Sequence, residues 1–445
     1  MSPPLDRERI LESLKAFDFR NGKSPLEALD FAADQLERYQ VHAPHPCYFG
    51  LFNPAPTAMG IAADTLVAAF NPQLAAWSHN PFASEVEAHL IRAMGARFGY
   101  DPQTADGVFT AGGAEANHTA LLTALASRFP EFREHGIHGL ARKPSFYLSV
   151  DGHDSMIKAA RLCGLGTEAA RRIPVAGDLK IDPRALAGAI ESDRRSGRAP
   201  FLVVATAGST GAGIVDPHEP IAEICARENL WFHSDAAYGG AAVLLDELKD
   251  EYRGIGRADS ITFDTHKWLS IPMAAGMYLT RHSNALIDTF RVAADYMPQD
   301  ASGMQVTDPF THSIQWSRRF IGLKVFLSLA VHGWKGYETI IRRQVALGNY
   351  LRECLRSAEW TIVNDTPLPV VCFVDSFRSE SAGFAAEIVR RVIASGKAWI
   401  STALLGGEKT AIRACINNFR TSREDVETLV EALNKAREET ETARN

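Results

Sequence analysis

The fold of this chain is best approached from the stretch Ser260-Ile-Thr-Phe-Asp-Thr-His-Lys-Trp-Leu269. It begins with β-branched and aromatic residues, as a buried strand does, and continues into a polar turn that carries His266 and Lys267. An unpaired ammonium group directly after a buried strand is costly, and the cost falls if the amine acts as a nucleophile or forms a Schiff base. A surface lysine after a strand explains the same pattern, so this motif alone leaves both interpretations open.

A second strand-like run, residues 230–234, leads into Asp235 and the small residues Ala236 and Ala237. A carboxylate at this place can face a cationic ring nitrogen, and small neighbours let a planar ligand approach. An ordinary turn aspartate is the alternative. The separation of Asp235 and Lys267 leaves room for one helical crossover, so we expect both side chains at neighbouring strand ends.

Two more motifs contain candidate ligand-binding residues. Gly112-Gly113 precedes a helical run, where free N–H groups and the helix dipole suit a phosphate, although a tight turn explains a lone Gly-Gly equally well. His153 follows the strand-like run 146–150, where an imidazole could stack on a planar ligand or move a proton. A histidine at a helix start that donates to a backbone carbonyl is the alternative.

Around these motifs the chain alternates helical and strand-like segments. Helical patterns cover 85–96, 114–127 and 182–192, and short apolar runs cover 146–150, 201–206, 230–234, 260–263 and 276–279. This alternation predicts an α/β fold with a doubly wound, mainly parallel sheet that helices cover on both faces. Ligands of such sheets bind at the carboxyl ends of the strands.

The flanking segments suggest three parts. Residues 25–36 form a helical pattern with an apolar stripe, and the proline-rich residues 41–57 predict a loop. Residues 291–312 lack periodicity and predict a mobile loop, after which 318–332 is helical and strands and helices alternate again. We therefore expect an N-terminal helical and extended segment (1–60), a large α/β domain (61–314) and a smaller C-terminal α/β domain (315–445).

Composition limits the possible functions. The 445 residues are 46% hydrophobic and 22% charged with a formal net charge of −6, which excludes disorder and argues against nonspecific nucleic-acid binding. No apolar stretch approaches a bilayer-spanning length of roughly 20 residues, so no membrane partner is expected. The six scattered cysteines and the absence of an apolar signal core at the start favour the cytoplasm. The histidine pair 42/45 flanks prolines, and the pair 135/138 lies in a polar turn without a nearby carboxylate cluster. No metal site is therefore predicted.

A phosphate cradle, a stacking histidine, an acid for a ring nitrogen and an imine-forming lysine are the parts that hold pyridoxal 5'-phosphate. Further motifs are His45–Gly50, Asn80–Glu87, Ala205–Gly213 and Gln315–Phe320. The two most specific motifs are Asp-Ala-Ala-Tyr-Gly-Gly at 235–240 and His-Lys-Trp at 266–268. Together these motifs resemble those of the group II pyridoxal-phosphate-dependent amino-acid decarboxylases. The resemblance to this aromatic amino-acid and glutamate decarboxylase superfamily runs from His45 to Thr421. It implies fold type I, with a seven-stranded, mainly parallel sheet in the large domain.

The resemblance also implies how the cofactor ring is held. Lys267 would form the Schiff base with pyridoxal 5'-phosphate, and the substrate amine would displace it. Asp235 would keep the pyridine nitrogen protonated, so that the ring accepts the electrons left as CO2 departs. His153 would stack on one face of the ring and Ala237 would pack against the other.

Other residues are implied at the edges of the cofactor. Gly113, Ala114 and the start of their helix would bind the phosphate, with Asp264 nearby. Thr206 would lie near the phenolic oxygen of the ring or near the stacking histidine. His266 would reach the substrate carboxylate or the phosphate side.

The activity implied is decarboxylation of a small-molecule L-amino acid to its amine and CO2, in a homodimer with active sites at the interface. The N-terminal segment would wrap the partner subunit, and Leu51–Pro54 would help to form a substrate pocket. One departure concerns the catalytic loop, where Phe310 stands in place of the tyrosine that protonates the substrate carbon. Phenylalanine there resembles aldehyde synthases, which couple decarboxylation to oxidative deamination, unless Tyr296 or His312 supplies the proton.

Other reactions on the same fold are possible alternatives. A carbon–carbon lyase shares much of the pattern. A desulfurase needs a nucleophilic cysteine on a flexible loop, whereas Cys354, Cys372 and Cys415 lie in periodic apolar surroundings typical of buried thiols. A cofactor-binding protein without activity would bind pyridoxal phosphate but show no spectral change with any amino acid.

The side chain of the substrate is the least defined feature. Several aromatic residues suit an aromatic or other apolar side chain, and we favour such a substrate, although the same residues suit interface packing: Phe52, Trp77, Phe82, Phe310 and Trp316. Arg413, near the C-terminal strand, could instead meet an acidic group, or form a structural ion pair.

Overall fold

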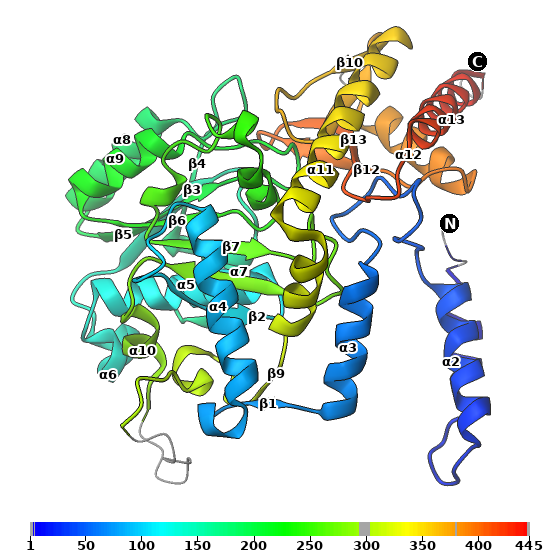
Figure 1. Cartoon of the computed structure of the whole chain (residues 1–445). Helices are drawn as coiled ribbons and strands as arrows, with labels where there is room; N and C mark the ends of the chain where they lie inside the picture. Colours follow the sequence, from blue (N-terminus) through cyan, green and yellow to red (C-terminus); the bar gives the residue numbers. More distant parts are fainter. Residues whose placement is uncertain (1–2, 4, 293–302, 379–380, 443–445) are drawn as a thin grey trace.

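The computed structural model describes residues 3, 5–292, 303–378 and 381–442, and its centre is a seven-stranded sheet (Figure 1). The strand order is β2-β8-β7-β6-β5-β3-β4. The strands are β2 (Asp106–Thr110), β3 (Pro144–Ser149), β4 (Ala170–Ile173), β5 (Ala199–Thr206), β6 (Trp231–Asp235), β7 (Ser260–Asp264) and β8 (Gly276–Thr280). Strands β3 to β7 run parallel to one another. Strand β8 is antiparallel to both of its neighbours, β2 and β7. The predicted mainly parallel seven-stranded sheet is confirmed.

Successive side chains of the strands point to opposite faces, and each face is covered by helices. Phe146 and Leu148 of β3 pack with residues of α5 (Gly113–Arg128) and α7 (Ser155–Leu162). Tyr147, between them, belongs to the core on the other side, with residues of α8 (Pro183–Arg195) and α9 (His218–Glu228). Burial on both faces explains why the strands are continuously apolar rather than alternating.

A long helix joins the large sheet to a smaller one. Helix α11 (Gly322–Ser357) contacts α3 (Ala58–Phe70) and α4 (Pro81–Arg97), and beyond a kink at Gly333, where φ is +62°, it continues toward β10 and α13. The expected helix at 318–332 therefore begins later and extends further than its pattern indicated. Residues 318–319 instead form β9 (Arg318–Arg319), paired with β1 (Gln73–Leu74). Because α11 contacts both parts, the domain boundary at 314/315 stays a prediction.

The smaller sheet is antiparallel, in the order β10-β11-β13-β12. Its strands are β10 (Trp360–Ile362), β11 (Val370–Asp375), β12 (Ser401–Leu405) and β13 (Lys409–Cys415), and α12 (Ala382–Ala394) and α13 (Arg423–Thr442) pack on it. The N-terminal segment hydrogen-bonds to this part, since the Phe49 N–H donates to the Trp399 carbonyl at 2.8 Å and the Phe49 carbonyl accepts from the Cys415 N–H at 2.9 Å. The extended start of the chain is thereby held beside its end.

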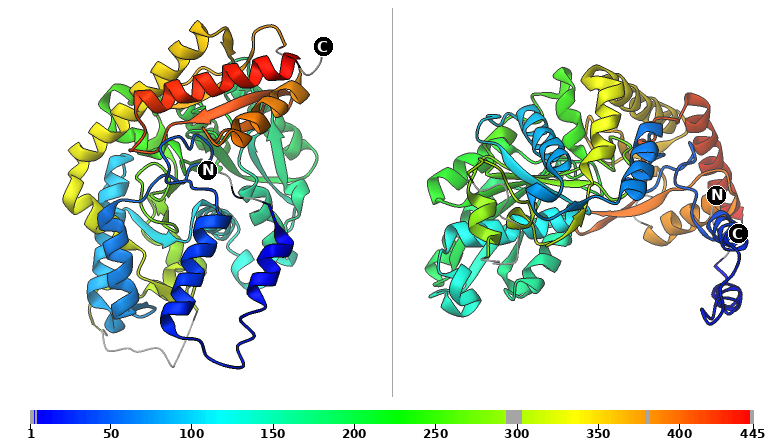
Figure 2. Two further views of the ribbon diagram at one scale, coloured as in Figure 1. Left: turned by 90° about the vertical axis from the view of Figure 1, so that its right-hand side faces the viewer. Right: turned by 60° about the horizontal axis from the view of Figure 1, so that its bottom comes forward.

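Two N-terminal helices stand away from the body of the molecule (Figures 1 and 2). They are α1 (Arg7–Leu14) and α2 (Pro25–Tyr39), and neither has a buried residue. Leu26, Leu29 and Leu36 of α2 are 73%, 66% and 60% exposed. The predicted apolar stripe thus lies on an exposed helix, and these three leucines stay mostly uncovered by the part of the chain that the structure describes.

Short elements complete the chain. They are α6 (Phe132–His135), α10 (Ala285–Phe290) and a 3-10 turn, η7 (Pro309–His312). Part of the loop predicted at 291–312, residues 293–302, lies outside the described residues. Among the helices that the structure describes, none is long and apolar enough to cross a membrane.

Candidate active site

The predicted site residues meet at one edge of the large sheet. Strands β5, β6 and β7 are parallel, so Thr206, Asp235 and Asp264 end their strands side by side, and Thr206 pairs directly with Asp235. A cavity opens at this edge, and its lining includes every predicted cofactor-binding residue except His266. The lining consists of Gly113, Ala114, Asn117, His153, Thr206, Gly208, Thr210, Asp235, Ala237, Tyr238, Asp264 and Lys267.

Lys267 lies in the turn after β7 with its amine at the cavity. Its Nζ is 3.1 Å from Oδ2 of Asp264, a carboxylate that is only 2% exposed. The ring centre of Phe52 lies 5.8 Å from the same nitrogen. The carboxylate stabilises the ammonium group that the sequence places after a buried strand, and the amine remains within reach of a ligand in the cavity.

Gly113 begins α5 in close contact with the same carboxylate. A Cβ atom at this position would lie 2.8 Å from Oδ2 of Asp264 and 3.3 Å from Cβ of Ala237, so only glycine fits without a shift. The first-turn N–H groups of a helix have no acceptor within the helix, and with the helix dipole they favour an anion. Gly113 and Ala114, both in the cavity lining, are thus placed to hold a phosphate.

Asp235 is 6% exposed and receives two hydrogen bonds from the protein. The backbone N–H of Ala237 donates to Oδ1 at 3.2 Å, and Asn117 Nδ2 donates to Oδ2 at 2.8 Å. Sequence analysis assigned no role to Asn117. Its spacing of one helical turn from Gly113 was the available signal, because residues four apart share a helix face.

His153 is exposed in this chain and borders the cavity. Its Nδ1 accepts a hydrogen bond from the backbone N–H of Ser155 at 3.2 Å, at the beginning of α7. The alternative of a helix-start histidine that donates to a backbone carbonyl is therefore not what this contact shows, since the ring accepts from an N–H, and the ring borders the cavity. Stacking of this ring on a cofactor stays a prediction.

His266 is not among the residues that line the cavity. Its Nδ1 lies 3.0 Å from the carbonyl oxygen and 3.2 Å from the nitrogen of Ala275, and Nε2 is 3.9 Å from Oδ2 of Asp264. Burial lowers the pKa of His266. The ring thus joins the turn after β7 to the segment before β8, and its expected reach to a substrate carboxylate or phosphate stays a prediction.

Thr206 is positioned by a carboxylate that sequence analysis missed. Its N–H donates to Oδ2 of Asp216 at 2.7 Å, and the N–H of Ile181 donates to Oδ1 at 2.9 Å. Asp216 is 3% exposed, and burial raises its pKa to about 6. This contact holds the end of β5 in place, and Gly208 and Thr210 follow in the cavity lining.

Three stacked aromatic rings lie beside Lys267. Phe52 stacks on Tyr238 with ring centres 3.8 Å apart and planes at 14°, and Tyr238 stacks on Trp268 at 5.1 Å and 16°. Phe52 comes from the segment 51–54 that was expected to contribute to a substrate pocket. Tyr238, within the quoted motif at 235–240, was not assigned a role from the sequence.

Arg413 of β13 closes the site from the small sheet and is 2% exposed. Its Nε donates to the carbonyl of Thr210 at 2.9 Å, and Nη1 donates to the carbonyl of Gly50 at 2.5 Å. Its guanidinium carbon lies 4.8 Å from the ring centre of Phe52. Nη2 has no partner and no carboxylate pairs with this arginine among the described residues, so the alternative of a structural ion pair is not observed.

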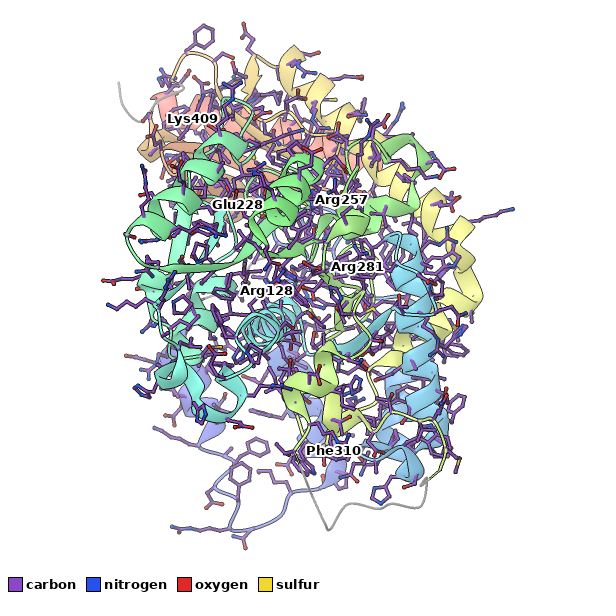
Figure 3. The ribbon with its side chains drawn as sticks, turned by 90° about the vertical axis from the view of Figure 1, so that its left-hand side faces the viewer. Arg128, Glu228, Arg257, Arg281, Phe310 and Lys409 are labelled. Atoms are coloured by element: carbon purple, nitrogen blue, oxygen red, sulfur yellow. The ribbon has the colours of Figure 1, made fainter. Side chains whose placement is uncertain are left out.

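The other predicted aromatic residues lie elsewhere. The Phe310 N–H donates to Ala75, and its ring is 4.9 Å from Trp316. Figure 3 shows Phe310 at the end of the molecule opposite Lys409, which begins β13. Phe82 is 64% exposed, and Trp77 donates through Nε1 to Glu85. Phe52 alone among the five borders the site of its own chain.

Of the two alternative proton donors, His312 lies away from the cavity of this chain. His312 Nε2 is 3.2 Å from Oδ2 of Asp106, which begins β2 and therefore lies at the opposite edge of the sheet. Tyr296 lies outside the described residues. Within one chain, neither Phe310 nor His312 is among the residues that line the cavity.

Comparisons with known proteins agree with this geometry. The family model described as "Pyridoxal-dependent decarboxylase conserved domain" matches residues 11–375. An aromatic-L-amino-acid decarboxylase of Bacillus atrophaeus is 32% identical, with 94% of this chain and 86% of that protein covered. An acidic amino acid decarboxylase of Bos taurus is 28% identical, with 97% and 84% covered. The crystal structure of Oryza sativa TDC with PLP and tryptamine superimposes with a TM-score of 0.90 at 25% identity, covering 99% of this chain and 93% of that one.

Proposed function

We propose that this chain, which belongs to the pyridoxal-dependent decarboxylase family, converts an aromatic or other apolar L-amino acid to its amine and CO2. The chain is a pyridoxal-phosphate-dependent carboxy-lyase. The observation that carries the proposal is the joint position of Lys267, Asp235 and Gly113 around one cavity.

The residues of the cavity fit pyridoxal 5'-phosphate, the cofactor of the family. When bound, this group accepts the electron pair left on the substrate carbon as CO2 departs. A Cβ atom at Gly113 would meet Asp264 at 2.8 Å, so the absence of a side chain leaves room at the helix start for an anion. An amine, a carboxylate and a helix N-terminus are the three partners that an aldehyde, a pyridine nitrogen and a phosphate require.

Each of these partners has one task. Lys267 would hold the cofactor aldehyde through Nζ, and its amine, 3.1 Å from Oδ2 of Asp264, can hold a proton. Asp235 would accept a hydrogen bond from the ring nitrogen and keep that nitrogen protonated. The stacked Phe52, Tyr238 and Trp268 exclude water from the side of the cavity beside Nζ.

The apolar substrate class rests on Phe52. This buried ring lies 5.8 Å from Lys267 Nζ and presents carbon rather than charge to the region beside the amine. One observation favours an acidic substrate as the second candidate, namely the unpartnered Nη2 of the buried Arg413. The ring of Phe52 covers the guanidinium carbon at 4.8 Å, which is why we rank the apolar class first.

We further propose that the protein is a cytoplasmic homodimer with its active sites at the interface. The exposed leucine stripe on α2 supports a dimer, because a second copy would remove this apolar surface from water. Phe82 and Trp316 lie on exposed or partly exposed surface away from the chain's own cavity, which suits a contribution to the partner's site. Six free cysteines suit a reducing compartment.

The test is an absorbance titration of the cofactor band with the common amino acids, followed by product analysis of every amino acid that changes the spectrum. We expect CO2 and amine in equal amounts from an aromatic or apolar amino acid. Aldehyde, ammonia and peroxide without amine would identify an aldehyde synthase. Turnover of acidic amino acids alone would overturn the apolar class, and cleavage without CO2 would indicate a carbon–carbon lyase.

The covalent role of Lys267 has its own test. Borohydride reduction and peptide mass mapping should leave the cofactor mass on the peptide that contains Lys267. Lys267→Ala should lose this label and all turnover while its circular dichroism stays that of the wild type. Lys249→Ala, on an exposed lysine paired with Asp246, serves as the control. A label retained in Lys267→Ala would contradict the assignment.

A further inference from the structure

Asn117 sits at the centre of a buried hydrogen-bond network behind Asp235. Its Nδ2 donates to Oδ2 of Asp235 and to Oγ of Ser155, both at 2.8 Å. Its Oδ1 accepts from Thr262 Oγ1 at 2.7 Å and lies 3.2 Å from His233 Nε2. Asn117, His233 and Thr262 are each no more than 1% exposed. Both ends of the amide are thus used, and one of them is directed at the carboxylate in the cavity.

The network continues through His233 to a tryptophan. His233 Nδ1 lies 2.8 Å from Ser260 Oγ, and that oxygen accepts from Trp231 Nε1 at 2.9 Å. Burial lowers the pKa of His233 to about 4, so its ring is neutral at pH 7 and carries one N–H. Asp235 is the carboxylate in contact with this network, the phenol of Tyr278 interacts with Ser260, and the remaining described partners are hydroxyls, the amide and the indole.

The direction of each hydrogen bond follows from the donors available. If the ring N–H is on Nε2, it donates to Asn117 Oδ1, and Ser260 donates to Nδ1, so each pair has one donor and one acceptor. The other tautomer would set Nε2 and Oδ1 against each other as two acceptors. Turning the Asn117 amide around would place its oxygen against the carboxylate of Asp235.

We propose that Asn117 and His233 are positioning residues that hold the Asp235 carboxylate in place as a hydrogen-bond acceptor for the protonated ring nitrogen of the cofactor. This inference rests on the proposed function. Trp231, Ser260, His233 and Asn117 form a line in which every hydrogen bond donates toward Asp235. No group in the line accepts a hydrogen bond from Asp235, so the carboxylate is left free to accept one from the protonated ring nitrogen of the cofactor.

Asn117→Leu tests the central amide, because leucine has a similar volume and cannot donate. Apoenzyme is titrated with pyridoxal 5'-phosphate, and the dissociation constant is taken from the quenching of tryptophan fluorescence. Because the variant loses a hydrogen bond to a charged group, we expect its dissociation constant for pyridoxal 5'-phosphate to rise about tenfold or more. With a turned-over amino acid, kcat should fall and KM should stay near the wild-type value. Thr119→Val is the matched control, on the same helix, 1% exposed and bonded only to Glu115 in its own helix.

His233 provides an independent pair of variants that does not depend on how Asn117→Leu folds. His233→Gln keeps an N–H where Nε2 lies and should bind cofactor within about threefold of the wild type, whereas His233→Phe should lose about as much affinity as Asn117→Leu. Wild-type cofactor affinity in Asn117→Leu, or equal losses in the Gln and Phe variants, would overturn the inference. Absence of CO2 release by wild type that binds cofactor would instead overturn the proposed function alone.

Discussion

Among the residues of the site, Asp235 is the one whose charge we expect to have the largest effect on cofactor affinity and kcat. Replacing Asp235 with alanine removes the acceptor for the ring nitrogen and leaves the Asn117 amide without its carboxylate partner. We expect cofactor affinity and kcat each to fall about 10- to 100-fold, the range of a lost hydrogen bond to a charged group. Fluorescence titration of apoenzyme and CO2 release measure the two quantities.

The control for this variant is Asp246→Ala, on an exposed aspartate that pairs with Lys249 at the surface. It should leave both quantities unchanged. Asp235→Ala with wild-type rates would show that the ring nitrogen finds its partner elsewhere.

At the residue scale, the sequence predicted the side chains that lie within motifs and missed those that other segments bring in. Asp235 and Lys267 could be predicted because they follow strand-like runs, and Gly113 because it precedes a helical run. His266 could not be oriented, because its partner Ala275 belongs to the far side of the turn. Asp216 was missed for the same reason, since its two backbone partners are Thr206 and Ile181.

Helix α5 owes its position to the glycine at its first residue. Gly113→Ala would place a Cβ atom 2.8 Å from Oδ2 of Asp264, and this carboxylate is paired with Lys267. We expect a shift of the helix start that weakens cofactor affinity by about tenfold, measured by fluorescence titration. Gly188→Ala in the middle of α8 is the matched control, because no atom lies within 4 Å of its Cβ.

The control should stabilise the protein by roughly 0.5–1 kcal/mol, since alanine favours a helix over glycine. A Gly113→Ala protein that binds pyridoxal phosphate as well as the Gly188→Ala protein would contradict the cradle at the helix start.

Helix α9 begins with a buried histidine that ties it to β6. His218 Nδ1 lies 2.7 Å from the carbonyl of Asp216, Nε2 lies 2.8 Å from Ser234 Oγ, and burial lowers the pKa of His218 to about 4. A folded-state pKa below the ordinary 6.5 means that stability is fully present above pH 6.5 and is lost as the pH falls toward 4. Between pH 7 and pH 5 this histidine should cost about 2 kcal/mol.

Urea unfolding of His218→Asn at the two pH values checks this, at fixed protein and cofactor concentrations. The variant should lose about 2 kcal/mol less than wild type on going from pH 7 to pH 5. The raised pKa of Asp216 acts in the opposite sense, and its effect cancels in the comparison because both proteins contain it. His79→Asn, at an exposed position, should behave as wild type.

At the element scale, long periodic segments were predicted within a few residues, and short or edge elements were missed. The expected helix at 114–127 is α5, and the expected strand at 260–263 is β7, one residue longer. Strand β4 escaped because it lies at the sheet edge, where Arg171 and Arg172 interrupt the apolar run. Helix α11 was predicted too short because Gly333 interrupts its pattern while the chain resumes the helix beyond it.

At the scale of the whole molecule, the apolar stripe on α2 is exposed to water in the single chain. Replacing Leu26, Leu29 and Leu36 together by serine should raise the dimer dissociation constant by at least tenfold, because three leucines that are more than half exposed would no longer be buried by a second copy. Sedimentation velocity over a dilution series measures it. Leu404→Ser, at a leucine that is 56% exposed on β12, is the control.

Unchanged dimerisation of the triple variant would place the interface elsewhere.

At the scale of the whole molecule, the sequence predicted the fold type through its motifs. It could not predict that Phe52 would reach Lys267 while Trp77 and Phe82 would not, because that depends on how distant segments are joined.

The clamp made by Arg413 has a consequence for biosynthesis. One guanidinium, supplied by β13, holds both Gly50 and Thr210. A ribosome releases these three positions in order, so the nascent polypeptide can form the strands of the large sheet before the residue that joins Gly50 to Thr210 has been synthesised. A chain truncated before β13 would therefore keep Lys267 but lose the guanidinium that joins these two segments.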